Sequence, residues 1–171
     1  MKFSSLKIDW SPFTICAPGE KAPYPRALTT VEGLGDRLRF VAFAELQAVH
    51  AFSAAAHLYA DTPPAARELW LTLSREEEKH FQLLIARMKE LGVEPSERPQ
   101  SLALWQSFDR CNTAREFAVF MAKAEDRGRH AGEQFYETLL KIDLVTAELF
   151  KRIAEEEKEH IRLAASVMNL L

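Results

Sequence analysis

A set of ligand-type residues occurs twice in the sequence, at an offset of 80 positions and without gaps. Each copy has one lone glutamate, followed 32 residues later by a Glu-x-x-His motif. The residues are Glu45, Glu77 and His80 in the first copy and Glu125, Glu157 and His160 in the second. Apolar positions repeat with them, such as Leu83 with Leu163 and Met88 with Met168. The chain is therefore expected to contain two helical hairpins of the same construction.

Helical periodicity and breaker residues divide the chain into four long helices. We expect them at about residues 31–60, 64–91, 113–141 and 144–170, with a short helical piece at 102–110. Asp61 or Thr62 should cap the second helix, and Gly92 should end it. Two short connections and one long crossover predict an all-α four-helix bundle whose second and third helices run parallel. No segment alternates as a strand would.

The first 30 residues differ in composition from the rest. They contain Pro12, Pro18, Pro23 and Pro25, so no long helix can pass through them. Residues 1–30 are therefore predicted to form an extended N-terminal arm, and residues 31–171 the four-helix bundle domain.

The spacing within each copy suits metal binding. Residues three apart on a helix point about 60° apart and lie about one turn along it, so the Glu and His of each motif can reach one ion. The equal 32-residue spacing places each lone glutamate opposite its motif across a hairpin. Four carboxylates on apolar helix faces would repel each other unless cations offset their charge. Two divalent ions would do so, and mixed carboxylate and imidazole ligands suit iron or manganese.

Other residues near these motifs are expected to have ordinary roles. A single Glu-x-x-His motif is more often part of a solvated face, and Glu76, Glu78, Glu156 and Glu159 are interpreted in that way. Glu125 is the weakest ligand candidate by itself, because Arg129 lies near it in the sequence. His50 and His130 also repeat, but they are turned well off the ligand face, so they are expected either beside the ligands or at the surface, and the surface is favoured. Tyr59, Trp70 and Trp105 are expected in the core.

Charge and composition exclude several classes of protein. The net charge of −3 and pI near 6.0 make nucleic acid an improbable partner. No apolar run is long enough for a membrane span, and the N-terminus lacks the apolar region of a secretory signal, so the cytoplasm is the expected compartment. Cys16 and Cys111 form no Cys-x-x-Cys pair, which excludes a disulfide scaffold and a cysteine-ligated iron site.

The doubled Glu…Glu-x-x-His pattern resembles the ferritin-like superfamily of di-iron carboxylate proteins. Residues 17–20, 30–33 and 43–48, with Leu104-Trp105 and Glu125-Asp126-Arg127-Gly128, are similar to a bacterial ferritin-like family of uncharacterised function. That family is a relative of the tRNA-modifying di-iron hydroxylase. The resemblance implies a ferritin-like bundle with two iron ions that react with dioxygen or peroxide, held by the six repeated residues. Because the chain has no cysteine-ligated electron-transfer domain, turnover would need an external electron donor.

Three functions remain open at this point. The first is an oxidoreductase of the hydroxylase or oxidase type. The second is an iron-handling or peroxide-detoxifying protein without an organic substrate, and the third is a structural helical bundle. The sequence assigns no catalytic residue beyond the six candidate ligands, names no substrate and leaves iron against manganese undecided. A homodimer through the helices or the arm is also left open.

Overall fold

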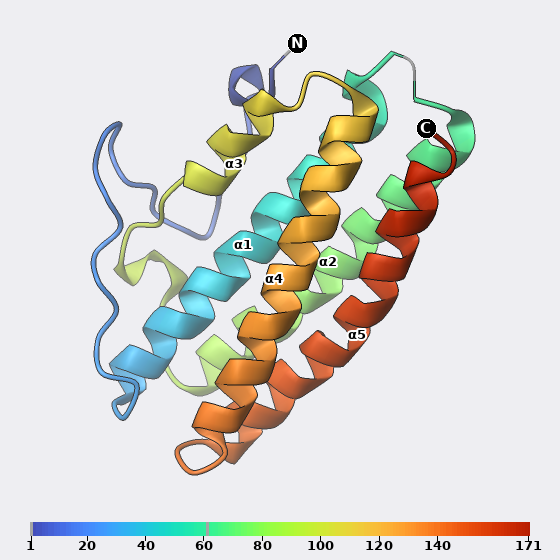
Figure 1. The fold of residues 1–171 in the computed structure, drawn as a ribbon. Coiled ribbons are helices and arrows are strands. Elements are labelled where there is room, and N and C mark those ends of the chain that lie inside the picture. Colours follow the sequence, from blue (N-terminus) through green and yellow to red (C-terminus); the bar gives the residue numbers. More distant parts are fainter. Residues whose placement is uncertain (1, 61) are drawn as a thin grey trace. The chain divides into compact units, whose positions relative to one another are not determined.

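The computed structural model describes residues 2–60 and 62–171 (Figure 1). Within these residues helices are the only extended regular elements, and the one β-type pairing is an isolated bridge between Ile15 and Gln100. The α-helices are α1 (Val31–Leu58), α2 (Pro64–Glu90), α3 (Ala103–Ser107), α4 (Ala114–Leu139) and α5 (Leu144–Met168), and the short 3-10 turns are η1 (Phe3–Ser5), η2 (Pro95–Glu97) and η3 (Phe108–Arg110). The predicted all-helical class is confirmed, and the four long helices begin and end close to the predicted positions.

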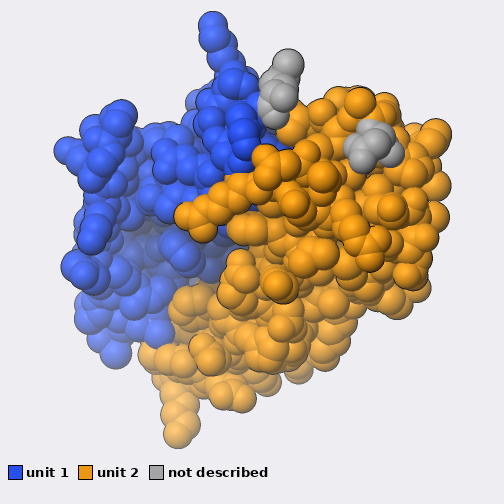
Figure 2. Space-filling model, turned by 45° about the horizontal axis from the view of Figure 1, so that its top comes forward, with its two compact units in different colours: residues 1–51, 75–109 blue, residues 52–74, 110–171 orange. Residues whose placement is uncertain are grey.

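The chain forms two compact units, which are coloured separately in Figure 2. The first contains residues 1–51 and 75–109, and therefore the start of α1, the end of α2 and all of α3. The second contains residues 52–74 and 110–171, including all of α4 and α5. The expected division into residues 1–30 and 31–171 remains a prediction.

Helix α2 ends at the predicted glycine. Gly92 has a φ of 68°, a backbone conformation that favours glycine. Its N–H donates to the Lys89 carbonyl at 3.1 Å, and the Val93 N–H donates to the Met88 carbonyl at 2.9 Å. This pair of hydrogen bonds is the Schellman motif, which satisfies carbonyls that the last turn of a helix leaves open.

The start of α2 differs from the expectation. Asp61 lies outside the described residues. Thr62 is buried, but its hydroxyl has no hydrogen-bond partner among the described residues, so its side chain does not cap the helix as proposed. Its carbonyl instead accepts a hydrogen bond from the Arg67 side chain at 3.0 Å. Pro64 occupies the first helical position, where the missing N–H has no intrahelical partner in any case.

Side chains cap α4 and α5 in the second unit. The Thr113 hydroxyl accepts from the Glu116 N–H at 3.1 Å, and the Asp143 carboxylate accepts from the Thr146 N–H at 2.9 Å. Only a short turn separates the two helices, so they run antiparallel and side by side, as Figure 1 shows. Their close approach places Gly132 against Ala154.

Buried charges connect three segments of the first unit. The Asp36 carboxylate, whose side chain is 5% exposed, accepts from Arg26 at 2.7 Å, from Arg39 at 2.8 Å and also from Arg98. The Arg39 side chain is fully buried and donates to the backbone carbonyl of Glu94 at 2.8 Å. The chain before α1, α1 itself and the loop after α2 are therefore joined through one carboxylate.

The same network controls the ionisation of Asp36. Burial by itself would raise the pKa of this carboxyl, but hydrogen bonds from the side chain and backbone of Arg26 and the charge of Arg98 outweigh burial. The pKa of Asp36 is therefore held well below its ordinary value.

Burial agrees with the expected core. Tyr59, Trp70 and Trp105 are 6%, 1% and 3% exposed, which confirms their interpretation as core residues. None of the described helices combines the length and apolar character needed to cross a membrane.

We predict that Asp36→Asn lowers the free energy of unfolding by about 3 kcal/mol at neutral pH, because it leaves the buried Arg39 guanidinium with only the more exposed carboxylate of Glu97 as an ionic partner. Urea denaturation at several pH values would measure this. A depressed pKa stabilises the fold above the ordinary aspartate pKa, and this stabilisation is lost as the pH falls below it. The difference between wild type and Asp36→Asn should therefore shrink in acid, and a constant difference would contradict the network.

Candidate metal centre

The first Glu-x-x-His motif lies on the buried side of α2. Glu77 is 0% and His80 1% exposed, and Phe81 and Leu84 beside them are also buried. The Glu77 Oε2 and His80 Nδ1 atoms are 3.8 Å apart. Both side chains therefore face the core from the same turn of α2, as the three-residue spacing predicts.

The second motif has the same construction on α5. Glu157 and His160 are each 3% exposed, and Ile153 and Ala164 on the same face are buried. The Glu157 Oε2 and His160 Nδ1 atoms are 3.4 Å apart. The buried residues of α5 recur every three or four positions, so helical periodicity alone turns this glutamate and histidine inward.

The separations within both motifs fit two ligands of one ion. They exceed the usual N–H···O hydrogen-bond length of about 2.7–3.2 Å. Bonds of about 2.1 Å to a common ion would place neighbouring ligand atoms about 3.0–3.4 Å apart. The observed 3.4 Å in α5 meets this requirement, and the 3.8 Å in α2 needs only a small side-chain rotation.

The two lone glutamates differ from each other. Glu125 is 6% exposed and lies on the buried stripe of α4 with Met121, although Arg129 is nearby in the sequence. Arg129 pairs instead with Asp126 at 3.1 Å and Glu133 at 2.8 Å, so its charge is held along the outside of α4. Glu45 on α1 is only half-buried.

The structure brings together four of the six predicted ligands. Each of Glu77, His80, Glu157 and His160 offers one ligand atom, these atoms lie within 4.8 Å of one another, and all four residues are buried. Such a group could hold a metal ion. Glu45 and Glu125 are not part of this group. Their role as ligands therefore remains a prediction from the repeat.

The neighbouring charged residues are solvated, as expected. Glu76 pairs with Lys79 at 2.7 Å, Glu156 with Arg152 at 2.8 Å, and Glu159 with Arg162. Glu78 accepts a hydrogen bond from Gln82 at 2.7 Å. These four glutamates therefore interact with side chains of their own helix, on the side that faces away from the buried glutamate and histidine of each motif.

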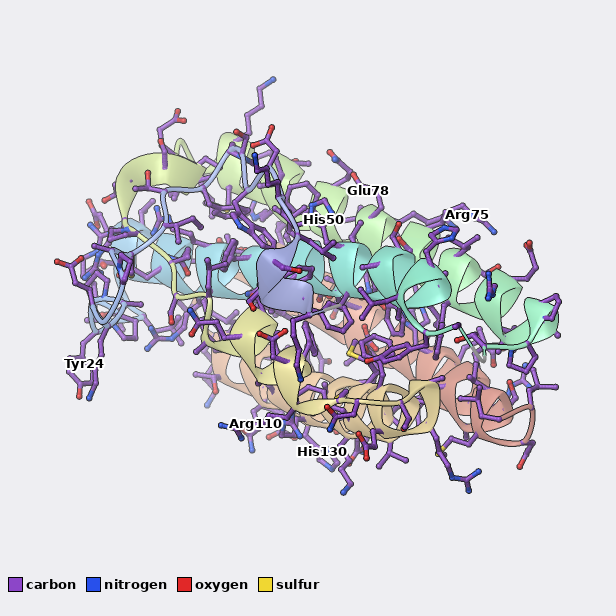
Figure 3. All side chains as sticks on the ribbon, turned by 90° about the horizontal axis from the view of Figure 1, so that it is seen from above. Tyr24, His50, Arg75, Glu78, Arg110 and His130 are labelled. Carbon is purple, nitrogen blue, oxygen red and sulfur yellow. The ribbon has the colours of Figure 1, made fainter. Side chains whose placement is uncertain are left out.

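The repeated histidines occupy different environments, and both are labelled in Figure 3. The His130 side chain is 57% exposed, which confirms the surface interpretation. His50 is half-buried, and its ring packs edge-to-face on Trp10 at a centroid distance of 5.4 Å. Burial lowers the pKa of His50, although the charges of Glu78 and Asp9 act in the opposite direction.

The surface interpretation of His50 is therefore wrong, because the chain before α1 covers it. Trp10 also packs on Phe43 at 5.7 Å and on Trp105 at 5.1 Å. The sequence signal for this cover was the presence of aromatic residues, Trp10 among them, in a segment that also carries many polar residues and prolines.

These observations define the class of protein: an all-helical protein with a buried group of two glutamates and two histidines that could hold a metal ion. Residues 11–168 match the family described as "Protein of unknown function (DUF455)", and the chain belongs to that family. Comparison with curated proteins and with solved structures found no match.

We predict that Glu157→Met leaves the free energy of unfolding of the metal-free protein unchanged or raises it, because Glu157 and Glu77 belong to one buried group, where two carboxylates repel each other without metal, and the substitution removes one of them. Thermal and urea denaturation in the presence of a chelator would measure the change. Glu159→Met, on the exposed side of the same helix, is the matched control and should change little. A marked loss of stability in Glu157→Met alone would mean that the chain itself supplies the compensating charge.

Proposed function

We propose that this chain is a dinuclear metal-carboxylate protein with a ferritin-like four-helix bundle. We infer that it binds two iron ions and acts as an oxidoreductase on dioxygen or peroxide, of the hydroxylase or oxidase type. The observation that carries the proposal is the group formed by Glu77, His80, Glu157 and His160, buried on apolar helix faces with ligand atoms within 4.8 Å of one another.

The charge of the predicted ligand set supports two ions rather than one. Glu45 and Glu125 would add two carboxylates to those of Glu77 and Glu157. Four carboxylates in one helical core carry a charge that two divalent cations would neutralise, while the histidines bind as neutral ligands. Carboxylate with imidazole is a donor set that suits iron and manganese, and no cysteine belongs to the observed group.

Each residue has a defined part in this proposal. Bound metal ions would supply Lewis-acid and redox chemistry. The carboxylates of Glu77 and Glu157 would bind and orient them, and His80 and His160 would each complete a motif from the next turn of the same helix. The apolar neighbours limit the access of water, which strengthens electrostatic interactions inside the site. Electrons for turnover would come from an external donor, because the chain carries no cysteine-ligated redox group.

We predict that purified protein, grown in medium with added iron and manganese, contains about two metal ions per chain, as expected for this ligand set. Glu77→Ala/Glu157→Ala should lose this metal, because it removes one carboxylate from each motif. Glu76→Ala/Glu156→Ala is the matched control: the positions are adjacent, are related by the same repeat and lie on the solvated faces, so metal should be retained. Elemental analysis measures all three proteins.

The results separate the three functions. Equal metal in all proteins, or none in the wild type, would contradict the proposed centre and leave a structural bundle. With metal bound, oxygen consumption that continues while a reductant is supplied supports the oxidoreductase. Consumption that stops in proportion to the iron added would favour the iron-handling function instead.

A further inference from the structure

Gly128 lies on the inward stripe of α4 and is nevertheless exposed. The buried residues of α4 are Ala114, Phe117, Ala118, Met121, Glu125, Gly132 and Leu139. With about 100° of rotation per residue, Gly128 points only about 40° from the centre of this stripe. Burial would be expected there, yet Gly128 is exposed, and among the described residues a Cβ at this position would have no atom within 4 Å apart from its chain neighbours and the backbone of its own helix. The stripe therefore has a notch between Glu125 and Gly132.

Packing explains one of the two glycines in this part of α4 and not the other. A Cβ on Gly132 would lie 3.2 Å from the Ala154 Cβ and 3.4 Å from the Phe150 carbonyl oxygen, so the close approach of α5 favours glycine. At Gly128 the space is open, and glycine in a helix interior is less stable than alanine. The first copy of the repeat has a buried alanine, Ala48, in the corresponding position. The second copy thus omits a methyl group that its helix could accommodate.

The notch lies beside the carboxylates of the second unit. Since α4 and α5 are antiparallel and Gly132 faces Phe150 and Ala154, moving back one turn along α4 corresponds to moving forward one turn along α5. Gly128 is therefore at the level of Glu157 and one turn beyond Glu125.

The exposed fractions of the nearby glutamates and the ion pairs of Arg129 agree with an opening at Gly128. Glu125 and Glu157 retain 6% and 3% exposure, whereas Glu77 on α2 has none. Of the two arginines that flank the glycine, Arg129 is held along α4 by Asp126 and Glu133, so it is directed away from Gly128.

We propose that the notch at Gly128 is the opening through which a small ligand, of the size of dioxygen, peroxide or azide, reaches the metal centre. This inference rests on the proposed function. The space left by one missing side chain admits a ligand of a few atoms. The absence of a side chain at Gly128 would therefore set the upper limit on ligand size. Gly128 does not itself bind metal.

The test uses Gly128→Ala and Gly128→Leu, with Lys123→Leu on the exposed, opposite face of α4 as the control. Metal content is measured first. Azide binding to the iron-loaded proteins is then followed by stopped-flow absorbance, and thermal melting is measured without metal. We expect full metal content in all variants and a melting temperature for Gly128→Ala at or above that of the wild type. Azide association should be roughly tenfold slower in Gly128→Leu, because the leucine side chain would occupy the space that is open at Gly128. Gly128→Ala should be slowed less, and Lys123→Leu should be unchanged.

The outcomes separate this inference from the proposed function. Full metal content with equal azide association rates in all variants would overturn the notch as the route and leave the metal centre intact. A wild-type protein without metal would overturn both. If Gly128→Leu does not fold, Gly128→Ala decides: slower azide association at full metal content supports the route, and an unchanged rate overturns it.

Discussion

The burial of carboxylates on apolar helix faces is the constraint on which the rest of this structure depends. Glu77 and Glu157 are as buried as the leucines and isoleucines around them, and each is followed one turn later by a buried histidine. Removing a carboxylate from water costs several kcal/mol unless a compensating charge is present. A helix tolerates this arrangement only when the surrounding apolar contacts hold it in place, as the long, regular faces of α2 and α5 do.

The buried carboxylate of Asp36 meets the same electrostatic problem in another way. Around Asp36, the chain supplies its own countercharge through three arginines, one of them fully buried. That solution fixes the segment before α1 and the loop after α2 to one helix. For the buried glutamates and histidines, we propose that metal ions supply the countercharge. In this proposal the Asp36 cluster has a structural role, whereas the group of buried glutamates and histidines has a role in metal coordination.

The repeat is symmetric in sequence and asymmetric in its surroundings. His50 is covered by Trp10 while His130 is exposed, although the two occupy equivalent positions. Ala48 is buried while Gly128 is exposed. Helical register is the same in each pair, so these differences arise from what packs against the helix. Contacts between segments distant in sequence are not encoded in a local pattern, and neither the cover over His50 nor the notch at Gly128 could be predicted from the residues alone.

The sequence by itself determined the helices, their ends and the residues that turn inward. Helical period, proline and glycine positions are local properties, and they placed the Gly92 stop and the two Glu-x-x-His motifs. Only the tertiary structure decided which side chains meet. It grouped four of the six predicted ligands, left Glu45 half-buried, and turned Arg129 away from Glu125. The physical reason is that orientation on a helix follows from spacing, whereas burial and ligand distances depend on every element that packs nearby.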